Sequence, residues 1–154
     1  MSSLKAFQVA AELAERQRDA ARQTLKDVQS ALQAAQAQLE QLAGYAGETQ
    51  GRWGMRAGAE VQPEVMYHHY QFMGRLDHAI SLQTGAVSAQ DARVEQARQA
   101  LLAAELRLAS LRKVLERRRA ELALQQQRRE QKQTDERAAL RAARAQGGAL
   151  DQEH

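Results

Sequence analysis

Apolar residues recur at alternating intervals of three and four along the first third of the chain, and this heptad pattern constrains the fold more than any other feature. It places one narrow apolar stripe along a helix, and such a stripe needs a partner helix to cover it. Arg18 is its one charged position. The stripe consists of Leu4, Phe7, Ala11, Ala14, Arg18, Ala21, Leu25, Val28, Leu32, Ala35, Leu39, Leu42 and Ala46.

A second stripe with the same spacing begins at Met66 and fades after Leu115. Most of the 44% apolar residues are Ala and Leu, and only six residues are aromatic, which suits a narrow seam better than a thick core. The second stripe consists of Met66, His69, Met73, Leu76, Ile80, Gln83, Val87, Gln90, Val94, Ala97, Leu101, Ala104, Leu108, Leu111 and Leu115.

Glycines separate the two stripes. Each glycine disfavours a helix by about 1 kcal/mol relative to Ala, and Pro63 suits the first turn of a new helix. The chain is therefore expected to turn between Gly58 and Pro63, and helices joined by a short turn pack antiparallel. The glycines are Gly44, Gly47, Gly51, Gly54 and Gly58. The level pairs expected from this register include Leu25 with Val94, Leu39 with Ile80, and Leu42 with Leu76.

The predicted fold is all-α, a single domain over residues 1–154 that forms an antiparallel two-helix coiled-coil hairpin with a longer, overhanging C-terminal helix. About 30 residues would overhang, roughly 45 Å of helix. A lone polar helix is marginal in water, so the overhang is expected to fray or to need a partner. The predicted boundaries are helix 1 at about 3–57, a turn at about 58–62, helix 2 at about 63–146, and a disordered tail at 147–154.

Catalytic and metal-binding signals are weak in this sequence. Without cysteine there is no disulfide, thiol nucleophile or zinc–thiolate site. His68 and His78 are ten residues apart, whereas two metal ligands on one helical face need a spacing of three or four. His69 falls on the second stripe and is expected to pack edge-on near the turn. A two-helix rod also has no interior wide enough for a catalytic pocket. We therefore expect no enzyme activity, no cofactor and no metal site.

Membrane insertion is not expected either, because no stretch approaches the roughly 20 apolar residues of a transmembrane helix. The first twenty residues lack the apolar run of a signal peptide. These features predict a cytoplasmic protein.

Two regions are candidate contact sites. Residues 116–146 hold nine basic and five acidic residues, which is consistent with a solvated helix or with docking into an acidic protein cleft. Nucleic acid is disfavoured there, because the segment lacks aromatic residues that could stack on bases. Clustered aromatic side chains near the turn indicate a second contact site. They are Tyr45, Trp53, Tyr67, Tyr70 and Phe72.

Three sequence blocks resemble the FliJ family of the bacterial flagellar type III export apparatus. They are QLEQLAGY at 38–45, YQFMGRLDHAI at 70–80 and DERAALR at 135–141. The resemblance implies a stalk-like coiled coil, peripherally associated with the cytoplasmic membrane at the flagellar base.

The resemblance also implies partners. One end would enter and stimulate the hexameric export ATPase (FliI-like), the other would contact the cytoplasmic linker of the membrane export gate (FlhA-like), and emptied export chaperones would be recycled. Thr49 and Gln83 depart from the family pattern, in which these positions hold an aromatic residue and a histidine. The implied gate contact is Gln38, Leu42, Tyr45, Phe72, Leu76 and Ala79. The candidates for contact with the ATPase ring are Phe7, Leu111, Arg112, Arg117, Arg118 and Arg119.

Two alternatives share these sequence features. The stalk protein of an injectisome has the same architecture. A basic coiled coil that binds nucleic acid or an anionic membrane surface through residues 116–146 would show affinity that falls steeply with salt.

Overall fold

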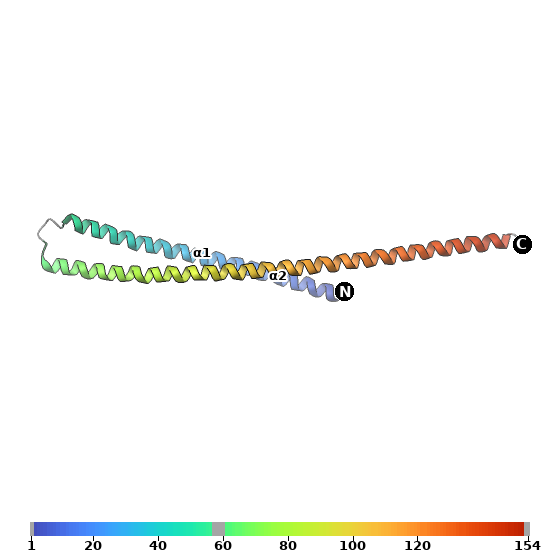
Figure 1. The fold of residues 1–154 in the computed structure, drawn as a ribbon, viewed down its shortest axis with the longest axis horizontal. Helices are drawn as coiled ribbons and strands as arrows, with labels where there is room; N and C mark the ends of the chain where they lie inside the picture. The colour runs from blue at the N-terminus through green and yellow to red at the C-terminus, as the bar shows by residue number, and fades with distance from the viewer. Residues whose placement is uncertain (1, 57–60, 153–154) are drawn as a thin grey trace. The chain divides into compact units, whose positions relative to one another are not determined.

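The chain forms two long α-helices in a computed structural model, α1 (Ser2–Arg56) and α2 (Pro63–Gln152) (Figure 1). The structure describes the backbone of residues 2–56 and 61–152, and the side chains of residues 3–54 and 61–148. These residues contain helices and no strand, so the all-α prediction is confirmed. Over the described residues neither helix is apolar enough to serve as a transmembrane segment. Two parts of the chain are described in turn, residues 15–106 and then residues 1–14 with 107–154.

Within residues 15–106, α1 and α2 pack antiparallel as a coiled-coil hairpin. The Gln83 Nε2 donates a hydrogen bond to the main-chain carbonyl of Ala35 at 2.9 Å. Closer to the turn, the rings of Tyr45 and Phe72 lie 6.0 Å apart, centroid to centroid. Both contacts join positions that the expected register sets level, within one residue.

Burial follows the predicted stripes along both helices. Every position of the first stripe from Leu4 to Ala46 is buried or half-buried, and so is every position of the second from His69 to Leu115. Met66 is exposed. The first stripe continues beyond its predicted end, because Thr49 and Trp53 are also half-buried.

The core of residues 15–106 is thin. Leu76, Val94 and Ala97 are its buried apolar side chains, and none of the described side chains is completely shielded from solvent. Burial of apolar area contributes roughly 25 cal/mol per Å², so small seam residues give each heptad little stabilisation.

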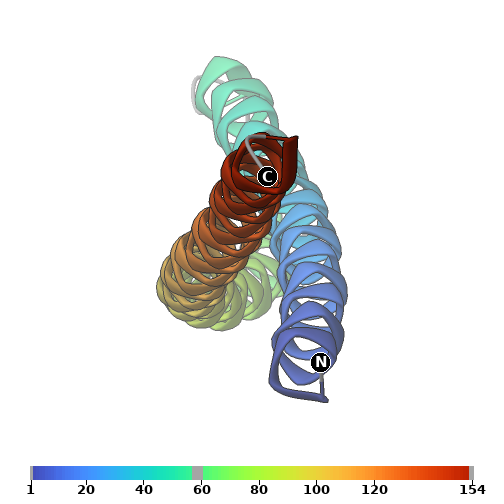
Figure 2. The same cartoon turned by 90° about the vertical axis from the view of Figure 1, so that its right-hand side faces the viewer.

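In the second part, residues 2–14 of α1 lie against α2 near its residues 108–118. Ala11, Ala14, Leu108 and Leu115 are buried there. Residues 116–148 of α2 are exposed throughout, and Figure 1 shows its last turns, in red, without α1 beside them. Figure 2 views the same turns end-on. The predicted overhang of helix 2 is therefore present, and it is helical.

The predicted boundaries need one correction. The predicted tail at 147–154 is wrong up to Gln152, because α2 continues through Gly147 and Gly148. These glycines meet no neighbouring atom that would force a break, and glycine lowers helix propensity without blocking the helix. Residues 153–154 lie outside the described residues.

The turn itself, predicted at 58–62, falls mostly on residues 57–60, which also lie outside the described part. α2 begins at Pro63 as predicted. The carbonyl of Gln62 accepts hydrogen bonds from the main-chain N–H groups of Val65 and Met66, at 3.0 and 3.1 Å. These bonds satisfy N–H groups that the first turn of a helix leaves without a helical partner.

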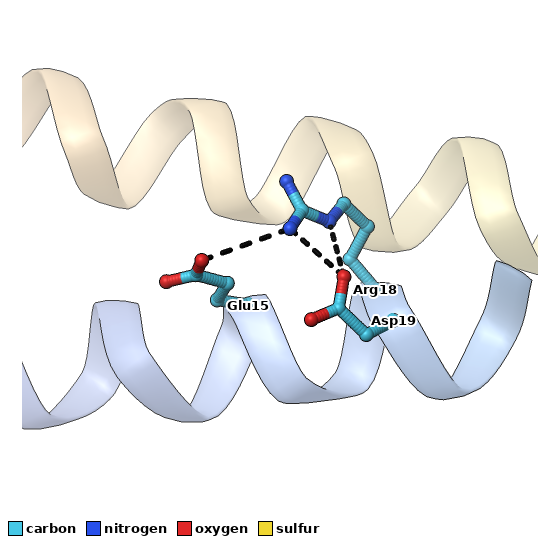
Figure 3. A network of polar contacts seen from close by, with 3 residues as sticks. All are labelled: Glu15, Arg18 and Asp19. Carbon is cyan, nitrogen blue, oxygen red and sulfur yellow. Dashed lines mark hydrogen bonds and ion pairs between the residues drawn. The ribbon is translucent and has the colours of Figure 1, made fainter.

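Arg18 is the charged residue of the first stripe, and its side chain is 15% exposed. It extends from α1 toward α2, and its guanidinium is held by acidic residues of its own helix (Figure 3). The Nη2 atom lies 2.8 Å from Asp19 Oδ1 and 3.8 Å from Glu15 Oε1. These pairs partly offset the desolvation of the charge, but an apolar side chain at this position would fill the seam without that penalty.

We therefore predict that Arg18→Leu stabilises the chain by about 1 kcal/mol. Urea denaturation followed by circular dichroism gives the measurement. The matched control is Arg22→Leu, at an exposed position one turn further along α1, which should change stability by no more than about 0.5 kcal/mol. A clear loss of stability in Arg18→Leu would show that the ion pairs favour folding.

The glycines of α1 give a second prediction. A Cβ atom added at Gly44, Gly47, Gly51 or Gly54 would meet nothing within 4 Å. Each Gly→Ala change should therefore stabilise the chain by about 0.5–1 kcal/mol through helix propensity alone. The control is Ala43→Gly at an exposed position, which should destabilise by a similar amount. Lower thermal stability in the alanine variants would contradict the helix observed here.

Candidate functional site

The turn end of residues 15–106 contains the aromatic cluster expected from the sequence, and its members lie on different sides of the helix pair. Tyr45 of α1 meets Phe72 of α2 edge to face, with the ring planes at 86°. Tyr67 and Tyr70 are exposed on α2, and Gln71 donates a hydrogen bond to the hydroxyl of Tyr67 at 2.9 Å. The cluster is thus partly a contact across the seam and partly exposed surface.

The residues of the implied gate contact come together around the Tyr45–Phe72 pair. Leu42 and Leu76 belong to the seam, and Leu76 is buried. Phe72 and Ala79 are half-buried beside the seam, while Tyr45 is 50% exposed. Gln38, the sixth residue, is exposed one turn before Leu42 in α1. The set therefore offers apolar surface without being enclosed.

His69 packs differently from the expectation of an edge-on contact. Its ring stacks on the indole of Trp53, with centroids 4.0 Å apart and planes 9° from parallel. The prediction was wrong because the first stripe was ended at Ala46, whereas Trp53 occupies a later position of the same stripe. Continuing the steps of three and four across the glycines would have found it.

Two hollows lie near this end, and neither is enclosed in the manner of an active site. One, of about 240 Å³, is lined by both helices. The other, of about 420 Å³, lies beside Gly74 on one face of α2, where the missing side chain leaves a notch. Among the described residues no group of three or more His, Asp or Glu side chains gathers as metal ligands would. The lining residues are Tyr45, Thr49, Arg52, Trp53 and His69 for the first, and Gln71, Gly74, Arg75 and His78 for the second.

Thr49 and Gln83, which were expected to differ from the resembled family, both face the seam. Thr49 is half-buried and lines the hollow between the helices. Gln83 is half-buried and reaches the carbonyl of Ala35 across the seam. The amide N–H of Gln83 therefore has a hydrogen-bond partner within the seam, as buried polar groups usually do.

The candidates for the ATPase contact lie in the part formed by residues 1–14 and 107–154. The guanidinium carbon of Arg118 lies over the ring of Phe7, 5.6 Å from its centroid. A cation over the face of an aromatic ring is attracted by the negative charge of that face, which is a cation–π interaction. Arg118 therefore helps to hold the end of α1 against α2. Leu111 is half-buried, whereas Arg112, Arg117 and Arg119 are exposed.

A family described as Flagellar FliJ protein matches residues 3–147 of the chain, nearly its whole length. The chain belongs to the FliJ family. No curated protein and no solved structure gives a significant match.

Membership of the FliJ family makes this chain a component of flagellar type III export. The family consists of non-enzymatic export components. The match favours the flagellar system over the injectisome.

Proposed function

We propose that this FliJ-family chain is a stalk-like coiled coil that links the export ATPase ring to the membrane export gate. Residues 1–14 and 107–154 bind and stimulate the FliI-like hexamer, and the turn end of α1 and α2 contacts the cytoplasmic linker of the FlhA-like gate. The chain also helps to recycle export chaperones. It works in the cytoplasm, at the membrane face of the flagellar base.

The Tyr45–Phe72 pair is the observation that carries this proposal. Aromatic side chains of this kind, partly exposed beside small and aliphatic neighbours, are frequent anchors of protein interfaces. The pair joins both helices, so one partner would contact both helices at the same place. This supports a protein contact at the turn end.

Exposed arginines support the ATPase contact. Arg117 and Arg119 flank the Arg118–Phe7 contact on the emerging part of α2. Guanidinium groups pair with carboxylates through two parallel hydrogen bonds, which fixes orientation. Charges that become desolvated in a ring channel contribute more than the same charges on an open surface.

We predict that Tyr45→Ala combined with Phe72→Ala weakens binding of the purified cytoplasmic region of the export gate by about 2 kcal/mol or more, because buried aromatic anchors typically lose this much on truncation. Calorimetric titration gives the affinity, and swimming motility should fall in the same variant.

The matched control is Tyr67→Ala combined with Tyr70→Ala, which removes two exposed aromatic rings from the same end of α2. Circular dichroism should show unchanged helicity in both variants, and stimulation of the ATPase should persist. Normal motility and normal gate binding in the Tyr45/Phe72 variant would leave this pair with a purely structural role.

We predict that reversing Arg117, Arg118 and Arg119 to Glu abolishes stimulation of ATP hydrolysis, since like charges would then face an acidic channel wall. Because Arg118 contacts Phe7, a second variant should reverse Arg117 and Arg119 alone. ATPase rate against added protein at fixed salt is the measurement, with gate binding retained.

The control reverses Arg128 and Arg129, which are also exposed but lie further along α2. If the Arg117/Arg119 variant stimulates ATP hydrolysis as well as wild type does, these arginines only face solvent and do not contact the ATPase. Full stimulation by a chain truncated at residue 116 would move the contact to Phe7 and its neighbours.

A further inference from the structure

The two sides of the seam differ within residues 15–106. The stripes occupy the a and d positions of the heptads, so the e and g positions flank the seam. In an antiparallel pair, g positions of one helix face g positions of the other. Tyr45 and Phe72 are both g positions, and their contact shows that these side chains share one side of the helix pair.

The g positions and the neighbouring c positions form the side that contains this contact. This side is almost free of charge between residues 31–45 of α1 and 72–89 of α2. Its uncharged polar members are Gln38 and Gln41, and its one charged member is Arg75. We call its apolar residues the apolar flank. They are Ala31, Ala34, Tyr45, Phe72, Ala79, Leu82, Ala86 and Ala89.

The e positions on the opposite side of the seam are mostly polar. All are exposed, whereas Ala31, Phe72 and Ala79 of the apolar flank are half-buried. The same two helices therefore present one polar side and one apolar side. Over the same stretch the e positions are Gln36, Ala43, Asp77 and Thr84.

The apolar flank is suited to packing against a third helix. Alanine at 31, 79 and 86 leaves room for another backbone to approach the seam, as small residues do wherever helices pack closely. Leu82 is 64% exposed and Tyr45 50% exposed, so two larger apolar side chains border this room. An amphipathic helix laid on this surface would bury its apolar face there.

Charge identifies the kind of helix. On α2, Arg75 lies near one end of the apolar flank and Arg93 lies just beyond the other end. The g and c positions of α2 between Val65 and Arg93 contain no acidic residue. Neither arginine forms an ion pair with any residue that the structure describes. Two unpaired guanidinium groups favour a partner with carboxylates in matching positions.

A second copy of this chain does not offer such a helix. Its exposed overhang, residues 116–146, has nine basic and five acidic residues, so it would bring arginine toward arginine. Two apolar flanks face to face would again oppose Arg75 and Arg93 with cations. The charges therefore favour another protein.

We propose that the apolar flank is the docking surface for an acidic amphipathic α-helix of a partner protein. This inference rests on the turn-end contact proposed above and deepens it, because it extends that surface from Tyr45 and Phe72 to Ala31 and Ala89 and assigns the partner segment a helical form and a charge.

A pair of adjacent residues provides the test. Leu82 belongs to the apolar flank, and Ser81, also exposed, lies toward the polar side. The probe is a labelled synthetic helix of about 20 residues, which spans the roughly 27 Å between Arg75 and Arg93. It has Leu and Ala on one face and Glu at both ends. Fluorescence anisotropy gives its affinity, beside a twin peptide with Lys in place of Glu.

We expect Leu82→Glu to lower the affinity for the acidic peptide by about tenfold or more, because apolar contact is lost and like charges repel. Ser81→Glu should change affinity less than about twofold. Wild type should bind the Glu peptide more tightly than the Lys twin, and Arg75→Gln with Arg93→Gln should reduce that preference.

Other outcomes overturn the inference. Equal losses of peptide affinity in Leu82→Glu and Ser81→Glu would exclude the apolar flank as the docking surface. Equal affinity of wild type for the two peptides would exclude an acidic partner. A dimer in sedimentation analysis that Leu82→Glu abolishes and Ser81→Glu retains would assign the flank to a second copy. If Leu82→Glu binds the cytoplasmic gate region as wild type does while the Tyr45/Phe72 variant fails, the turn-end contact stands and its extension is excluded.

Discussion

A seam of small apolar residues between two helices determines the properties of this chain. Because alanine occupies so many a and d positions, the helices have little apolar area to bury, and no described side chain is completely shielded. Polar groups can then reach the seam in two ways. Arg18 is paired with acids of its own helix, whereas Gln83 crosses to a carbonyl of the other helix. The second contact depends on register, so it favours one alignment of the pair.

Much of the fold could be predicted from the sequence, since the heptad spacing is a geometric property of the helix itself. The two stripes followed from it, whereas the antiparallel pairing and the start of α2 at Pro63 followed from the glycines and the proline at the turn. The tail was predicted wrongly because two glycines were taken as a stop, although a helix ends reliably at glycine only where the geometry of a cap requires it. Thr49 and Trp53 were missed as stripe positions for the same reason, because Gly47 and Gly51 beside them hid the continuing period.

The candidate site was less accessible to sequence reasoning. Level positions brought Tyr45 and Phe72 together, but their edge-to-face geometry and the parallel stack of Trp53 on His69 depend on side-chain conformations that spacing does not specify. Arg118 was expected as a charge for a partner, and it also holds Phe7. The difference in polarity between the two sides of the seam could be recognised once the Tyr45–Phe72 contact showed that the g positions of both helices share a side.

The stack of Trp53 on His69 has a practical consequence. Trp53 is the single tryptophan of the chain, and it lies in the last turns of α1 against the first turns of α2. Indole emission is sensitive to an aromatic ring in van der Waals contact, so the intrinsic fluorescence of the native chain reports on one place only. Separation of the helices beside the turn would change this signal, while melting of residues 116–146, which do not contact the indole, would leave it unaltered. The chain therefore carries a built-in optical probe that distinguishes local opening from loss of helix elsewhere.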